Sequence, residues 1–145
     1  MKLFVEFSGM VNTTVLIDDS DIDLFIQKRF LEVYQFSKTL TSYRSAEEAL
    51  EKLNSAKGEV APDVIFLDLN MPNVDGFGFL EGFNGLPQPI KDKSKIVVLT
   101  SSNSQKDRAQ AFSHQNVVHF VTKPLKQADI EELKKIMKPN DPTIA

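Results

Sequence analysis

The chain has 145 residues, 41% of them hydrophobic and 26% charged, which is typical of a single globular domain. It contains no cysteine and only two histidines, which excludes a disulfide scaffold, a thiolate zinc site, an iron–sulfur cluster, a cysteine nucleophile and a histidine-rich metal site. A formal net charge of −3 gives no reason to expect nucleic acid or an anionic membrane as a partner. No stretch approaches the roughly 20 apolar residues of a membrane span. The lack of cysteine fits a reducing compartment, and we expect a cytoplasmic protein.

The two ends of the chain differ in character from its middle. Residues 1–12 contain a short apolar patch that Glu6 interrupts, and they lack the long apolar region and cleavage site of a signal peptide. We interpret residues 1–12 as an N-terminal lead of uncertain role, residues 13–138 as one domain and residues 139–145 as a frayed tail.

Short apolar runs predict the strands of a sheet. Val15–Ile17, Val64–Leu67, Ile96–Leu99 and Val117–Val121 are β-branched or aromatic and show no polar alternation. Such runs are typical of parallel strands that are covered on both faces. A fifth run, Phe36–Tyr43, includes several polar residues, which favours the edge of the sheet.

Helical patterns occupy the gaps between these runs. In the first gap, Ile22, Phe25, Ile26, Phe30 and Val33 recur at helical spacing, which predicts an amphipathic helix whose apolar face covers the core. Ser45 is expected to cap the second helix. The apolar positions and ranges that define the remaining helices are Ala49, Leu50 and Leu53, then Phe77, Leu80 and Phe83, then residues 104–113, and finally Ile130, Leu133 and Met137.

Strand and helix thus alternate five times along the chain. This order predicts a parallel sheet with right-handed crossovers and helices on both faces. In such folds the functional residues lie beyond the carboxyl ends of the strands, at the topological switch point. The residues that follow each apolar run are therefore the candidates for a site.

Polar residues follow four of the five predicted strands. These residues are Asp18 and Asp19 after the first strand, Asp68 after the third, Thr100 and Ser101 after the fourth, and Lys123 after the fifth. An aspartate after a strand is usually a turn former or a helix cap, but here the residues converge on one end of one sheet. Three neighbouring carboxylates repel one another unless a cation neutralises them, and Mg²⁺ prefers such oxygen ligands. A carboxylate between a metal and a lysine is suited to accept a phosphoryl group.

Several segments together carry a family resemblance. They are Asp18-Asp19, Val64 to Pro72 with Asp75-Gly76, Val97 to Ser101, and Phe120 to Pro124. In order and spacing they resemble the receiver domain of two-component response regulators, of the stand-alone, chemotaxis-regulator type, over residues 13–138. The resemblance implies a doubly wound, flavodoxin-like α/β fold, in which a five-stranded parallel sheet has the order 2-1-3-4-5.

The resemblance also implies a role for each site residue. Asp68 is the expected phosphoacceptor and Lys123 the cationic partner of the phosphoryl group. Thr100 is the switch hydroxyl, and Ser101 is its small neighbour. The aromatic switch position is Phe120. The bond between Lys123 and Pro124 is expected to be cis.

A metal site is implied as well. Mg²⁺, with Mn²⁺ as an alternative, would be held by Asp19, Asp68 and the backbone carbonyl of Asn70, and by Asp18 through water.

The resemblance also implies protein partners. The implied phosphodonor is a sensor histidine kinase or a histidine phosphotransfer protein. A downstream protein would bind the face of the fourth helix, fifth strand and fifth helix, near Ala109, Phe112, Phe120 and Lys126.

Three alternatives remain at this point. The chain is either a free receiver or a domain of a larger hybrid kinase. A phosphatase of the haloacid-dehalogenase type also uses Asp and Mg²⁺ at a strand end, but its acid would stand where this chain has Asn70. A degenerate receiver that acts only as a docking module is the third reading, and the retention of Asp68 and Lys123 argues against it.

Overall fold

A computed structural model describes residues 11–56, 61–101 and 104–137. Its five-stranded sheet has the order β2-β1-β3-β4-β5, and all four strand pairs are parallel. The strands are β1 (Val11–Ile17), β2 (Ser37–Tyr43), β3 (Val64–Leu67), β4 (Lys95–Thr100) and β5 (Val117–Thr122). The predicted fold class and strand order are confirmed.

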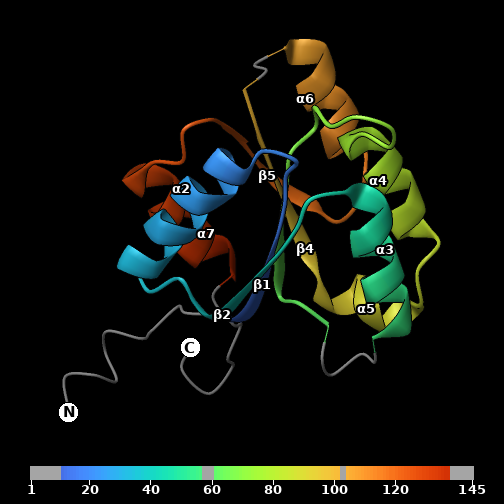
Figure 1. Cartoon of the computed structure of the whole chain (residues 1–145), viewed down its shortest axis with the longest axis horizontal. Coiled ribbons are helices and arrows are strands. Elements are labelled where there is room, and N and C mark those ends of the chain that lie inside the picture. Colours follow the sequence, from blue (N-terminus) through green and yellow to red (C-terminus); the bar gives the residue numbers. More distant parts are fainter. Residues whose placement is uncertain (1–10, 57–60, 102–103, 138–145) are drawn as a thin grey trace.

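Helices cover both faces of the sheet (Figure 1). One face is covered by α2 (Asp21–Val33) and α7 (Gln127–Met137). The other is covered by α3 (Ala46–Ser55), α4 (Gly76–Asn84), α5 (Gln88–Lys93) and α6 (Gln105–Phe112). Within the described ranges, no helix is long and apolar enough to cross a membrane.

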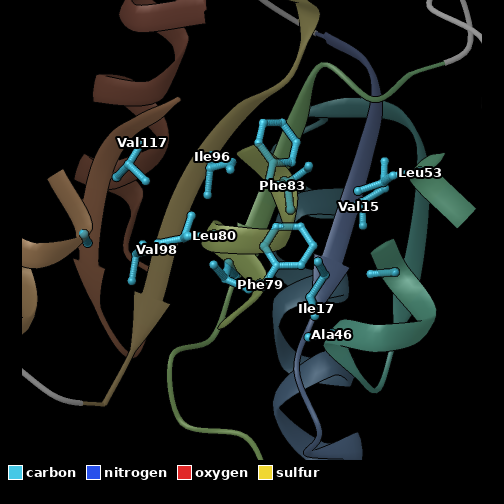
Figure 2. Close-up of a cluster of buried hydrophobic side chains, with 14 of the residues drawn as sticks. Val15, Ile17, Ala46, Leu53, Phe79, Leu80, Phe83, Ile96, Val98 and Val117 are labelled. Carbon is cyan, nitrogen blue, oxygen red and sulfur yellow. The ribbon is translucent and has the colours of Figure 1, made fainter. Parts of the chain in front are cut away.

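The core consists of two apolar clusters, one on each face of the sheet. Neighbouring residues of β1 alternate between them: Val15 and Ile17 belong to the α3–α6 side, and Leu16 to the α2–α7 side. Figure 2 shows Val15 and Ile17 with Phe79 and Phe83 of α4 in the first cluster. Because both faces are buried, the strands show continuous apolar runs rather than alternation.

The prediction that the apolar set of the first helix faces the core is wrong for four of its five residues, and only Phe30 packs partly against the core. In α2 the side chains of Ile22, Phe25, Ile26 and Val33 are exposed by 53–73%, whereas the buried residues of the helix are Leu24, Gln27 and Leu31. Most of the larger apolar set therefore faces away from the sheet. The buried face includes a polar residue because the Gln27 amide donates a hydrogen bond to Asp18 at 3.1 Å.

Three smaller differences concern other elements. The short helix α5, whose N-cap is Pro87, was not predicted. Leu50 in α3 is only partly buried, although it packs against the core. β1 begins at Val11, so its first two residues fall within the predicted lead of residues 1–12. The rest of that lead and the predicted tail of residues 139–145 lie outside the described residues.

Candidate functional site

Three carboxylates meet beyond the carboxyl ends of β1 and β3. The backbone amide of Asp68 donates to the carbonyl of Ile17 at 3.0 Å, which joins the ends of the two strands. One carboxylate oxygen each of Asp18, Asp19 and Asp68 lies within 4.8 Å of the others. Such a set of hard oxygen donors suits Mg²⁺ or Mn²⁺. The sequence thus predicted correctly that these residues converge.

Asp18 is the most buried of the three, with 1% of its surface exposed. Its Oδ1 accepts a hydrogen bond from the backbone amide of Ser20 at 3.0 Å, and its Oδ2 accepts from Gln27 and from the ammonium group of Lys123. A buried carboxylate needs such partners, and they hold this side chain in one orientation.

Lys123 lies among acidic side chains at the end of β5. Its Nζ is 2.8 Å from Asp18, 2.8 Å from Asp23 and 3.7 Å from Asp68. Burial alone would lower the pKa of Lys123, but its hydrogen bonds to Asp18 and Asp23, together with the negative charges of Asp68 and Asp18, outweigh that effect and raise it. The ammonium group is therefore charged. The contact with Asp23 was not predicted from the sequence, where an acidic residue in the first turn of a helix has an ordinary explanation.

Asp68 is buried beside this lysine, and its carboxyl group is a weaker acid than an ordinary aspartate. Burial, with repulsion from Asp18, raises its pKa to about 6, although Lys123 and the backbone amide of Asn70 act in the opposite direction. A nearby cation would therefore stabilise the ionised form of the Asp68 carboxylate. A metal ion bound by the cluster would supply that charge.

Thr100 ends β4 close to these acids and is fully buried. Its hydroxyl accepts a hydrogen bond from the Asn70 amide at 3.2 Å, and its carbonyl accepts from the backbone amide of Lys123 at 2.8 Å. The neighbouring Ser101 is exposed. The side chain of Asn70 thus contacts the predicted switch hydroxyl, whereas the metal-binding role of its carbonyl stays a prediction.

Phe120 lies on β5 and is 6% exposed. The guanidinium group of Arg108, from α6, lies 5.5 Å from the centre of this ring and 5.3 Å from that of Phe112. The sequence did not single out Arg108. The Lys123–Pro124 peptide bond is cis, as expected.

A doubly wound parallel sheet with an acid cluster, a hydroxyl and a lysine at its switch point defines a class of phosphoryl-accepting signalling domains. Residues 14–135 match the family model of the response regulator receiver domain. The chain belongs to the receiver domain family of two-component response regulators.

Relatives and solved structures agree with this assignment. The chain is 27% identical over 128 residues to hybrid signal transduction histidine kinase L of Dictyostelium discoideum, covering 88% of this chain but 7% of that protein. It is 29% identical to the probable methanogenesis regulatory protein FilR2 of Methanothrix harundinacea, covering 83% of this chain and 79% of that protein. A two-component response regulator from Cytophaga hutchinsonii superposes with a TM-score of 0.80 and 29% identity, over 88% of this chain and 97% of that one.

Proposed function

We propose that Asp68 accepts a phosphoryl group from a phosphohistidine donor. The observation that carries this proposal is the position of its buried carboxylate, which lies in the acid cluster and 3.7 Å from the ammonium group of Lys123. A sensor histidine kinase or a histidine phosphotransfer protein would be the donor. The chain is then a signalling phosphoacceptor that catalyses only its own phosphorylation and dephosphorylation, in the cytoplasm.

The chemistry needs one divalent ion. Asp19, Asp68 and the carbonyl of Asn70 would hold Mg²⁺ or Mn²⁺ directly, and Asp18 would do so through water. When bound, the ion neutralises charge on the carboxylates and on the transferring phosphoryl group. The raised pKa of Asp68 supports this requirement, because burial and, after it, repulsion from Asp18 make the ionised carboxylate unfavourable without a cation.

The transfer is a single displacement at phosphorus. An oxygen of the Asp68 carboxylate attacks, the bond from phosphorus to the histidine nitrogen breaks, and the imidazole leaves with the electron pair. The product is an acyl phosphate on Asp68, and Lys123 pairs with one of its oxygens. Attack by water on the same phosphorus later releases inorganic phosphate and restores the carboxylate.

The switch would work through Thr100 and Phe120. Movement of the Thr100 hydroxyl onto a phosphoryl oxygen breaks its bond with Asn70 and changes the space next to β5. Phe120 would respond, because it lies on β5, which pairs with β4, and its partner there is Val98, two residues before Thr100. A downstream protein would then distinguish the two states on the face of α6, β5 and α7, near Ala109, Phe112 and Lys126.

The phosphodonor would dock on the exposed side of α2. Ile22, Phe25 and Ile26 there are exposed by more than half, and unpaired apolar residues of this kind mark interaction sites. Ile26 also lines a cavity of about 80 Å³ that extends to Lys123. This surface therefore borders the site where a donor histidine must arrive.

The alternative functions have less support. A haloacid-dehalogenase-type phosphatase needs a proton donor where Asn70 stands, and the amide of this residue donates to Thr100 instead. A docking module without phosphorylation would not need three carboxylates and a lysine in contact.

Incubation with acetyl phosphate and Mg²⁺, followed by intact mass measurement, tests the proposal. The wild-type chain should gain the mass of one phosphoryl group, and Asp68→Asn should gain none while it keeps its circular dichroism spectrum. The same gain in both proteins would contradict the assignment of Asp68.

A further inference from the structure

The ammonium group of Lys123 is bound to a residue that the phosphoryl-transfer reaction does not use. Its two hydrogen bonds, both of 2.8 Å, go to Asp18 and Asp23, whereas the oxygen of Asp68 is 3.7 Å away. The lysine therefore lies closer to both of these acids than to the carboxylate that it would assist.

Asp23 differs from the acids of the cluster in its place and its exposure. It lies in the first turn of α2, outside the group formed by Asp18, Asp19 and Asp68. Its side chain is 38% exposed, against 17% for Lys123. Its carboxylate thus reaches the buried ammonium group from the rim of the site.

Helix stabilisation alone does not account for this contact. An acid in the first turn favours the helix through the dipole, and Asp21 in the same turn provides that effect as well. Asp21, however, pairs with Arg44 at 3.0 Å, on a part of the surface where both side chains are about two-thirds exposed. The two aspartates share the helix turn and the charge, and they differ in their cationic partners.

We propose that Asp23 is a positioning residue that holds Lys123 away from Asp68 in the unphosphorylated chain. This inference rests on the proposed function of Asp68. When a phosphoryl group arrives, Lys123 must exchange the Asp23 carboxylate for a phosphoryl oxygen, so the contact with Asp23 opposes phosphorylation. Asp23 also adds a negative charge near an incoming anion, and its neutralisation favours binding for both reasons.

The experiment is a titration of the Mg²⁺-loaded protein with beryllofluoride, which imitates the phosphoryl group on an aspartate. Asp23→Asn should tighten binding by about three- to fivefold, the range expected of a partly exposed ion pair. Asp21→Asn is the matched control, because it removes the same charge from the same helix turn, and its affinity should equal that of the wild type. Equal or weaker binding by Asp23→Asn would overturn the proposal.

A double-mutant cycle shows whether the effect passes through Lys123. In a Lys123→Met background, Asp23→Asn should tighten binding clearly less than it does in the wild type, because only the direct charge repulsion then remains. If it still tightens binding to the same extent, the effect is general charge repulsion and the proposal is wrong.

A second measurement does not depend on folding of the Lys123→Met variant. In a crystal structure of Asp23→Asn, Nζ of Lys123 should lie within hydrogen-bond distance of Asp68, and an unchanged separation would also refute the proposal. Failure of the wild-type protein to bind beryllofluoride at all would instead refute the proposed function itself.

Discussion

The side-chain amide of Asn70 donates a hydrogen bond of 3.2 Å to Oγ1 of Thr100. This bond connects the loop after β3 to the end of β4. One partner is exposed and the other is fully buried, so the bond links the surface of the site to the residue that we expect to move. In the unphosphorylated chain it holds the hydroxyl toward Asn70.

Removal of this bond should favour the phosphorylated arrangement. In Asn70→Ala the backbone carbonyl remains available to a metal, and only the amide is lost. Since a hydrogen bond contributes about 1 kcal/mol net, we expect beryllofluoride to bind about two- to fivefold more tightly. Calorimetric titration in the presence of Mg²⁺ measures this affinity. Weaker binding would mean that the amide contributes to the bound state instead.

Asp19 should be essential for the metal but not for the fold. It is exposed and belongs to a cluster of mutually repelling acids. Asp19→Ala should therefore weaken Mn²⁺ binding by more than about tenfold, because a hard divalent ion depends on such carboxylates. The free energy of unfolding without metal should not decrease. A Mn²⁺ titration and urea denaturation check these two outcomes, with Asp21→Asn as the control; an unchanged titration would contradict the ligand role.

The pKa of Asp68 predicts a dependence of stability on pH. Its ordinary value of 3.8 is raised to about 6 in the folded chain, chiefly by burial, so the folded state holds this proton more strongly than the unfolded state. The resulting stabilisation is complete below the ordinary value and is lost as pH rises through the raised one. Above about pH 6 the ionised carboxylate destabilises the metal-free fold.

Asp68→Asn should consequently stabilise the metal-free protein at about pH 8 by on the order of 2 kcal/mol, and have little effect at about pH 4. Urea denaturation at the two pH values measures the difference. A variant that is less stable than the wild type at the higher pH would show that the Asp68 carboxylate is not destabilising.

The exposed face of α2 should matter for a protein donor and not for a small one. Phe25→Ser and Ile26→Ser remove exposed apolar side chains from α2, of which Ile26 lines the cavity that extends to Lys123, whereas Val33→Ser removes one that is 70% exposed at the other end of the helix. We expect the first two variants to slow phosphorylation by a phosphohistidine protein by about tenfold, as substitution of central interface residues does. Acetyl phosphate should react at the wild-type rate in all three. Equal rates with the protein donor would place its docking surface elsewhere.

Phosphorylation should change the surroundings of Phe120. The ring is buried, and Arg108 lies over it, so a change in its position must disturb α6 as well. Beryllofluoride should therefore shift the NMR signals of residues 104–126 in addition to those near Asp68. If only the signals near Asp68 move, the downstream partner must bind another face.

Much of the fold could be predicted from the sequence because a parallel sheet buries both faces of its strands. The runs that became β3 and β4 are apolar throughout, so their order and burial were evident. Which side of α2 is buried could not be predicted in this way, because the buried side includes the polar residue Gln27, which donates a hydrogen bond to Asp18. Periodicity alone predicts that the larger set of apolar residues in a helix faces the core, but in α2 most of that set is exposed.

The candidate site likewise has residues that could be predicted from the sequence and contacts that could not. Asp18, Asp68 and Lys123 were predictable because each follows a strand, and the ends of parallel strands meet. The ion pair between Asp23 and Lys123 joins residues 100 positions apart, and Asp23 follows no strand. The stacking of Arg108 on Phe120 likewise depends on how α6 packs beside β5. Contacts of this kind depend on how distant segments pack together, so they become evident only in the structure.

The most direct test of the central claim is to locate the phosphoryl group chemically. Borohydride reduces an acyl phosphate on aspartate to homoserine, so the chain should be treated with acetyl phosphate and Mg²⁺, reduced, digested and analysed by peptide mass spectrometry. We predict homoserine at position 68 and at no other aspartate. Homoserine at Asp18 or Asp19, or none in a chain whose intact mass shows phosphorylation, would contradict the account.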